Sequence, residues 1–251
     1  MDPATNSLRY AYFNSDWQKS GPVTNDASTD RVGLAAFKND LYCVYQRADQ
    51  TLYAITSTDG STWGQATPIS NVSDFTYGAV NGPGLAVLRN SNTDKLCCSY
   101  AAGGYAVSLV SNDGAKWSGP SSFGSSDSSS TLAVFNEKFW SVNLWEAAGS
   151  YNITNIISSD GLNWPNYINN DYINFASTDS GSALVYSPVL DALICVFGGE
   201  GSHLFYSINT TNDPTKWTSP TIINGPQRAP GTSVGVAEVD GVIYVAYCNA
   251  A

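Results

Sequence analysis

The sequence predicts an all-β repeat protein, and three observations support this fold class. Short apolar segments alternate with stretches rich in Gly, Ser, Thr and Asn, a pattern typical of strands joined by turns. No window shows the apolar period of about 3.6 residues that an amphipathic helix requires. A short Trp-containing motif recurs along the whole chain, as in propellers and other repeat architectures.

The recurring motif is Ser-x-Asp-Gly-x-x-Trp. It occurs intact at residues 57–63, 111–117 and 158–164. A stretched copy spans 207–217, and a remnant lies at 14–17. Successive Trp residues of the five copies are 46 to 54 residues apart, which defines the length of the repeat.

Each repeat also carries the same order of strands. A first apolar strand such as 33–37 is followed by a turn and a second strand such as 41–45. A third strand such as 51–56 leads into the Asp-Gly turn and a short fourth strand. Four strands in about 50 residues form one propeller blade. The sequence therefore predicts one domain, residues 1–251, folded as a five-bladed β-propeller of four-stranded antiparallel blades.

The repeats are offset from the ends of the chain. Residues 234–248 provide two inner strands, and residues 8–13 provide the third strand of the same blade. We therefore expect the N- and C-terminal strands to close the ring within one blade, which leaves no blade edge free.

The repeated motif and the cysteines are interpreted as parts of the scaffold. The Asp carboxylate suits backbone N–H groups, the Gly suits positive φ, and the Trp is expected to pack against the neighbouring blade. Cys43, Cys98 and Cys195 fall at matching positions in different repeats. Such positions lie too far apart for disulfides, so we expect buried thiols.

The composition excludes several classes of partner. A net charge of −10 with only 11 Lys and Arg argues against nucleic-acid binding and against docking to anionic membranes. No apolar run is long enough for membrane insertion. The first residues lack the basic start and apolar stretch of a signal peptide, so we expect a cytoplasmic protein, with release by a non-classical route left open. We predict no cofactor, and no His/Cys cluster suggests a zinc site, although a metal ion in the central channel is left open.

The repeated motif also carries a family resemblance. Ser-x-Asp-Gly-x-x-Trp resembles the Asp box of sialidases. A short acidic chain made almost wholly of such repeats resembles the propeller lectins of mushrooms and bacteria. The resemblance spans nearly the full length but depends on one type of motif. It implies a β-propeller that binds sugars on the face opposite the Asp boxes.

The same face is expected to carry the ligand on topological grounds. Connections 19–32, 64–83, 118–131, 165–182 and 218–233 meet there, and loops on one face of a rigid scaffold commonly bind ligands. Sugar recognition combines aromatic faces with planar polar groups. The candidate carbohydrate-binding residues are Asp30, Arg31, Arg47, Asn81, Tyr100, Asp127, Trp145, Glu146, Asp179, Glu200, His203 and Arg228.

One aromatic residue lies near the end of the second strand in every repeat. Packing between blades explains most of this row, but Trp145 departs from the pattern and is followed by Glu146, so it is the strongest single candidate for ligand contact. The members of the row are Tyr45, Tyr100, Trp145, Phe197 and Tyr247.

Three functions are compatible with such a face. A lectin with several similar sites gains avidity for glycans or glycoconjugates. A glycoside hydrolase, sialidase-like or of another propeller type, would use paired carboxylates; the resemblance implies three Arg in a sialidase site, and this chain has five in all. A protein-interaction platform would present an apolar patch, whereas these loops are mostly Ser, Gly, Asn and Asp. We predict a lectin without catalytic residues; the sugar and the oligomeric state are left open.

Overall fold

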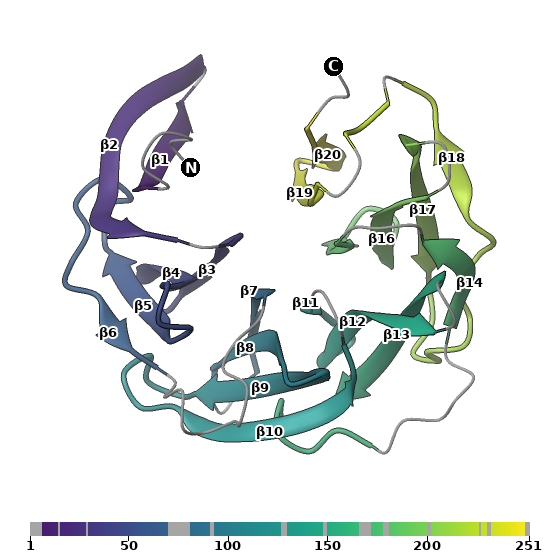
Figure 1. Cartoon of the computed structure of the whole chain (residues 1–251), viewed down its shortest axis with the longest axis horizontal. Coiled ribbons are helices and arrows are strands. Elements are labelled where there is room, and N and C mark those ends of the chain that lie inside the picture. The colour runs from purple at the N-terminus through teal and green to yellow at the C-terminus, as the bar shows by residue number, and fades with distance from the viewer. Residues whose placement is uncertain are drawn as a thin grey trace.

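The computed structural model describes residues 7–14, 16–28, 30–69, 81–90, 93–126, 130–147, 150–165, 172–177, 181–199, 202–225, 227–229 and 232–248. Over these ranges the chain is all-β, and its antiparallel sheets are arranged around a central opening like the blades of a propeller (Figure 1). The described ranges contain no apolar helix of membrane-spanning length.

Four of the sheets are complete four-stranded blades in which consecutive strands are neighbours. The predicted strand order of the repeat is therefore confirmed in each of them. The first blade comprises β3 (Gly33–Phe37), β4 (Asp40–Gln46), β5 (Leu52–Ser57) and β6 (Thr67–Pro68); the second, β7 (Asn81–Leu88), β8 (Lys95–Ala102), β9 (Tyr105–Ser111) and β10 (Ser118–Ser125). The third comprises β11 (Ser130–Phe135), β12 (Lys138–Ala147), β13 (Ser150–Ser158) and β14 (Tyr172–Ser177); the fourth, β15 (Ala183–Ser187), β16 (Ala192–Gly198), β17 (Leu204–Asn209) and β18 (Thr221–Ile223).

The two remaining sheets are hairpins from the two ends of the described chain. The N-terminal hairpin consists of β1 (Ser7–Asn14) and β2 (Asp16–Ala27), and the C-terminal hairpin of β19 (Gly235–Val239) and β20 (Val242–Ala246). They stand at opposite ends of the arc of blades (Figure 1). Among the described residues each hairpin pairs only within itself, so the strand pairing does not show the predicted ring closure.

The repeats share one register, and this register confirms the prediction for the cysteines. In each complete blade a Leu of the first strand lies opposite a small residue of the second: Leu34 and Cys43, Leu85 and Cys98, Leu132 and Ser141, Leu184 and Cys195. All three thiols are buried and unpaired. Burial removes water from around the thiolate and raises the pKa of Cys43 to about 12.

The register also corrects the predicted aromatic row. Two residues beyond Cys43 and Ser141 lie Tyr45 and Asn143, so Asn143 takes the row position in the third blade. Trp145 lies two residues further along β12, level with Arg47 of the first blade. The second strand of the third blade is longer than its counterparts. This extra length placed Trp145, rather than Asn143, in the predicted aromatic row.

The Asp boxes form the turns expected from their chemistry. In the second blade the Asp113 carboxylate accepts the backbone N–H groups of Ala115 and Lys116 at 2.8 and 2.7 Å. The Ser111 hydroxyl accepts the N–H of Gly114 at 2.8 Å, and Gly114 has a φ of 82°. The motif therefore fixes its own turn, as predicted.

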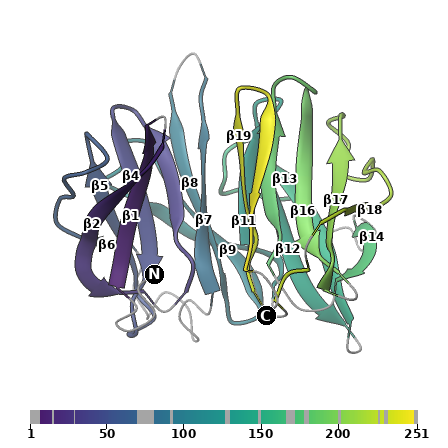
Figure 2. The same ribbon diagram turned by 90° about the horizontal axis from the view of Figure 1, so that it is seen from above.

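In the four complete blades, the Trp of the Asp box packs on the preceding sheet. Trp117 contacts the core of the first blade, and Trp217 lies edge-to-face against Trp140 of the third blade at 6.3 Å between ring centroids. These contacts hold neighbouring blades together. The strands of all blades run between two opposite faces of the molecule (Figure 2). One face carries the Asp boxes, and the other carries the turns between the second and third strands of each blade.

The Asp-box turns predict a measurable dependence of stability on acid. Partial burial opposes ionisation of Asp160, but hydrogen bonds from Asn163, Leu162 and Ser158 prevail and lower the pKa of its carboxyl group to about 2. An unfolded Asp titrates near ~3.9. The folded state therefore binds fewer protons than the unfolded state in this range. The stabilisation of the fold by the ionised Asp160 carboxylate is present above about pH 4 and is lost as the pH falls towards ~2.

We expect Asp160→Asn to flatten the fall in the free energy of unfolding between about pH 4 and 2. The expected loss above that window is ~1 kcal/mol, because solvent screens this partly exposed group. Urea denaturation at a series of pH values measures both effects. Parallel curves for the variant and the parent protein would contradict this assignment.

Candidate functional site

A cluster of polar and aromatic side chains lies where the N-terminal hairpin meets the first blade. Asp26 comes from the end of β2, Arg47 follows β4, and Tyr53 is the second residue of β5. Beneath them Leu8 and Tyr45 belong to one buried cluster that joins the hairpin to the blade. This packing places the three side chains on the face opposite the Asp boxes, where the ligand was expected.

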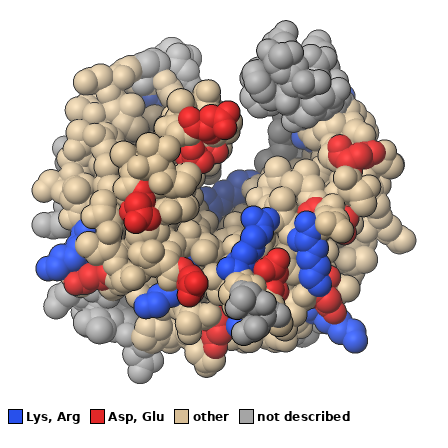
Figure 3. All heavy atoms as spheres, turned by 180° about the vertical axis from the view of Figure 1, so that it is seen from behind, with Lys and Arg blue, Asp and Glu red and all other residues tan. Residues whose placement is uncertain are grey.

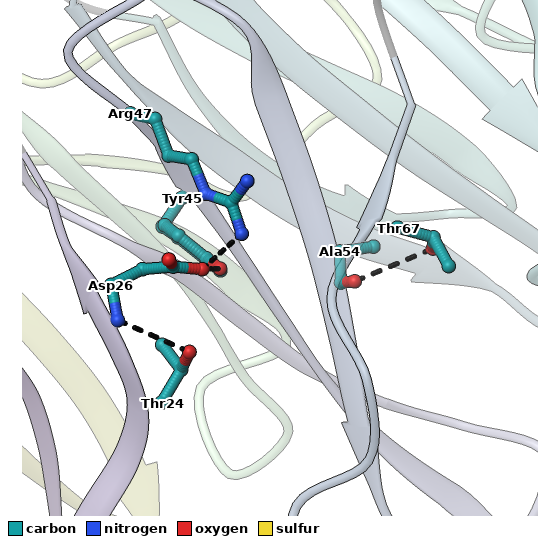
Figure 4. Close-up of polar contacts among 6 residues, drawn as sticks. All are labelled: Thr24, Asp26, Tyr45, Arg47, Ala54 and Thr67. Atoms are coloured by element: carbon teal, nitrogen blue, oxygen red, sulfur yellow. Dashed lines mark hydrogen bonds and ion pairs between the residues drawn. The ribbon is translucent and has the colours of Figure 1, made fainter.

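The cluster centres on the guanidinium group of Arg47. It forms an ion pair with the Asp26 carboxylate, which also accepts a 2.7 Å hydrogen bond from the Tyr45 hydroxyl (Figure 4). The guanidinium carbon lies 3.6 Å from the centroid of the Tyr53 ring, a cation–π contact. Tyr53 lies directly opposite Tyr45 in the β4–β5 ladder, with the two rings stacked 6.2 Å apart.

The charges of the cluster support one another. Partial burial opposes ionisation of Asp26, but hydrogen bonds from Tyr45 and Arg47 lower the pKa of its carboxyl group. Burial, with a smaller effect of Asp26, raises the pKa of Tyr45 to about 12, so its hydroxyl remains a donor at neutral pH. The cluster is thus an ion pair between Arg47 and Asp26 whose guanidinium group packs on the ring of Tyr53.

This arrangement has the chemistry for binding a polyhydroxylated ligand. The Arg47 and Asp26 side chains are each 30% exposed, so a ligand in solvent can reach both a planar donor and an acceptor. Tyr53 is half-buried and its ring carries the guanidinium group on one face, so only the exposed remainder of the ring offers aromatic surface to a ligand. The side chains are also held by one another, which reduces the entropy lost when a ligand binds.

Of the predicted residues, Asp30 and Arg31 connect blades. The Asp30 carboxylate accepts the backbone N–H of Gly82 in the second blade at 2.9 Å. Arg31 donates to the carbonyl of Gly82 at 3.2 Å and to that of Ser130, in the third blade, at 2.7 Å. Burial outweighs the nearby Asp30 charge and lowers the pKa of Arg31. These two side chains therefore join the inner strands of three blades, a structural task that their sequence context did not reveal.

Two further predicted residues lie in the interior. Tyr100 is 2% exposed and packs in the core between the first two blades, so it offers no surface to a sugar in this structure. Arg228 is fully buried and donates to the carbonyls of Ala229 and Thr232 at 3.0 and 3.2 Å. The guanidinium group also packs on the backbone of Gly198, where a side chain would collide with it.

The other predicted residues are spread around the ring. His203 lies in the turn between β16 and β17, where its carbonyl accepts the N–H of Gly199 at 3.0 Å. Trp145 and Glu146 lie in β12 opposite Asn152 and Tyr151, and Asn81 begins β7 opposite Ala101; the structure describes only the backbone of these three predicted residues. Asp127, Asp179 and Glu200 lie outside the described residues. Among the predicted residues, Arg47 is the one that the described structure places in the polar–aromatic cluster.

Sequence reasoning missed Asp26 and Tyr53. The repeat pattern predicts a connecting loop over residues 19–32, but β2 continues to Ala27 and carries Asp26 onto the first blade. Similarly, most of the predicted loop 118–131 is strand β10. Tyr53 falls within a predicted strand, and its position opposite Tyr45 could have been found by pairing the second and third strands of the repeat.

Among the described residues outside the polar–aromatic cluster, neither charged side chains nor metal-binding groups mark a second charged site on the face seen from behind (Figure 3). On the face seen in Figure 3, Lys, Arg, Asp and Glu side chains are scattered over a mostly uncharged surface. Within the described ranges no group of three or more His, Cys, Asp or Glu could hold a metal ion. The ion pair of Arg47 and Asp26 therefore remains the best-defined charged site.

Comparisons with known proteins support the fold. No family model and no curated protein sequence matches the chain. One similar structure is a variant of the lectin from Aleuria aurantia in complex with α-methyl-L-fucoside. The match covers 97% of this chain and 80% of the lectin chain, at 14% sequence identity and a TM-score of 0.68. A lectin from Burkholderia pseudomallei matches 98% of this chain over 75% of its own, at 14% identity and a TM-score of 0.66.

An enzyme is also among the similar structures. A β-fructofuranosidase from Bombyx mori matches 88% of this chain over 55% of its own, at 11% identity and a TM-score of 0.55. The Aleuria lectin has a six-bladed β-propeller fold with a fucose recognition mode of its own. At these identities the likeness establishes an all-β, propeller-like fold.

Proposed function

We propose that this protein is a lectin that binds glycans on the loop face of the propeller and does not hydrolyse them. The observation that carries the proposal is the Arg47–Asp26 ion pair over the ring of Tyr53. Such a site offers hydrogen bonds to sugar hydroxyls, and the part of the Tyr53 ring left exposed offers aromatic surface to sugar C–H groups. The similar lectins in complex with fucosides support the same class of ligand.

The ionised state of Asp26 does not suit it to one of the two carboxyl roles in a glycosidase, that of general acid. A glycosidase needs a carboxyl group of raised pKa as general acid, next to a second carboxylate. The pKa of Asp26 is instead lowered by its hydrogen bonds to Tyr45 and Arg47. The carboxylate is therefore suited to orienting Arg47 and accepting a hydroxyl, although one similar structure is a β-fructofuranosidase.

A glycan array with the purified protein tests the proposal, and we expect binding to a limited set of terminal sugars. The hits identify the sugar, which the residues of the site do not specify. Absence of binding to every glycan would overturn the proposal.

We further propose that the two hairpins belong to one blade and that the propeller has five blades in solution. The N-terminal hairpin packs on the first blade and the C-terminal hairpin on the fourth. One face of β20 is exposed, with Val242 and Tyr244 at 51% and 58%. Across the central cavity of about 620 Å³, Leu34 of β3 is also 56% exposed. Closing the ring would bring these apolar faces together.

Charged substitutions test this closure. If the face of β20 is covered, Tyr244→Glu buries a carboxylate and should lower the free energy of unfolding by about 2 kcal/mol or more. Tyr105→Glu is the matched control, since Tyr105 is 55% exposed on the second blade and should change stability by less than about 0.5 kcal/mol. Urea denaturation measures both. Equal, small effects would show that the ring stays open.

A further inference from the structure

A pocket lies away from the Arg47 site, at the outer part of the junction between the second and third blades. It has a volume of about 290 Å³. Small-molecule sites span roughly 300–1,000 Å³, so this size suits one saccharide unit better than an extended chain. The pocket is lined by Tyr105, Ser122, Phe123, Gly124, Ser125, Trp164 and Pro165.

Aromatic side chains form much of the lining. Trp164 stacks on Phe123 with 4.0 Å between ring centroids and 14° between ring planes. Phe123 is nearly buried, whereas Trp164 is partly exposed and Tyr105 is 55% exposed. Tyr105 lies opposite Ser125 at the start of the β9–β10 ladder. The pocket therefore combines two accessible aromatic rings with serine hydroxyls.

The pocket is held rigid by hydrogen bonds between the two blades. The indole N–H of Trp164 points inward to the Ser108 hydroxyl and the Gly161 carbonyl, both at 3.0 Å. Ser108 and Ser121 of the second blade donate to the carbonyls of Gly161 and Leu162 at 2.7 and 2.6 Å. The indole ring cannot rotate without breaking these bonds. The site is thus organised before a ligand arrives.

Among the described residues that line the pocket, the Tyr105 phenol is the one ionisable group. A carboxylated sugar would find no cation among these described residues and would lose hydration. A neutral pyranose would place its apolar C–H face on the rings and its hydroxyls near Ser122 and Ser125. The chemistry of the pocket therefore differs from that of the charged Arg47 site.

We propose that this pocket is a second carbohydrate site, specific for neutral pyranose units. The inference rests on the proposed lectin function and extends it to a second site with its own ligand chemistry. Two sites of different chemistry on one chain would allow a branched or composite glycan to be held at two points, with a gain in avidity.

Titration calorimetry with methyl pyranosides tests this site. The probes are the neutral methyl glycosides of galactose, mannose, glucose, N-acetylglucosamine and fucose, with methyl glucuronide as the charged comparison. For at least one neutral probe we expect Tyr105→Ala to lower the affinity of one site about tenfold, equivalent to ~1.4 kcal/mol. Tyr105→Phe should retain most of that affinity, because the ring remains. Val189→Ala, an exposed apolar residue of the fourth blade, is the control.

The outcomes separate this site from the Arg47 site. Sugar binding that Arg47→Ala abolishes and Tyr105→Ala leaves unchanged would overturn the second site and leave the lectin proposal standing. Binding that persists in Arg47→Ala and is weakened in Tyr105→Ala would support it. Preference for methyl glucuronide at the Tyr105-dependent site would overturn the specificity for neutral sugars. Absence of binding by the parent protein to any probe and to any glycan of the array would overturn both proposals.

Discussion

Trp140→Ala is expected to lower the free energy of unfolding by about 3–5 kcal/mol, the range for removal of a fully buried aromatic side chain. Trp140 is completely buried in β12 and contacts Phe135 and Trp217. Its indole N–H donates to the Phe135 carbonyl at 3.3 Å. The substitution would open a cavity between the third and fourth blades and remove one partner of a buried carbonyl.

Denaturation with guanidinium chloride measures this loss, because the midpoint and the slope of the unfolding curve give the free energy of unfolding. Trp140→Phe serves as the matched variant, because it keeps an aromatic ring and removes only the indole N–H and part of the volume. We expect a smaller loss of about 1–2 kcal/mol for it. A loss below about 1 kcal/mol for Trp140→Ala would contradict the assignment of this junction as a tightly packed part of the core.

Arg47→Ala should weaken glycan binding at the charged site by about two orders of magnitude. Hydrogen bonds to a charged group contribute ~1.5–3 kcal/mol each, and a factor of ten corresponds to ~1.4 kcal/mol. The guanidinium group also holds the Asp26 carboxylate and covers Tyr53, so its removal leaves the site without a fixed donor. Titration with the best glycan from the array measures the change.

Two variants distinguish a binding role from a structural one. Arg47→Lys keeps the charge but loses the planar fork and should recover only part of the affinity. Arg89→Ala removes an exposed Arg on the face that carries the Asp boxes, where its guanidinium donates to the Ala36 carbonyl at 3.1 Å. It should leave the affinity within about twofold. Equal losses in Arg47→Ala and Arg89→Ala would indicate a general effect of charge and contradict the site.

Much of the fold could be predicted from local sequence signals. The Asp-Gly-Trp motif specifies its own turn, because Asp113 and Ser111 bond the backbone of the same turn. Strand order followed from the spacing of these turns. Ring closure was predicted instead from the offset of the repeats, and it depends on contacts between the two ends of the chain. The pairing of the described residues joins each terminal hairpin only to itself.

The candidate site was harder to predict because it is built between sheets. Asp26 and Arg47 are 21 residues apart and meet only because β2 packs on the first blade. Residue type alone also did not reveal that Asp30 and Arg31 form hydrogen bonds to backbone groups of neighbouring blades. Arg47 could be identified because it follows a strand on the loop face, a position that the repeat does determine.

The most direct test of the lectin proposal is a calorimetric titration of the full chain with the best glycan from the array, with the same sample then assayed for cleavage products. We expect a saturable binding isotherm and intact glycan after prolonged incubation. Release of free sugar would show that the protein is a glycosidase, and a flat titration would show that the loop face does not bind glycans.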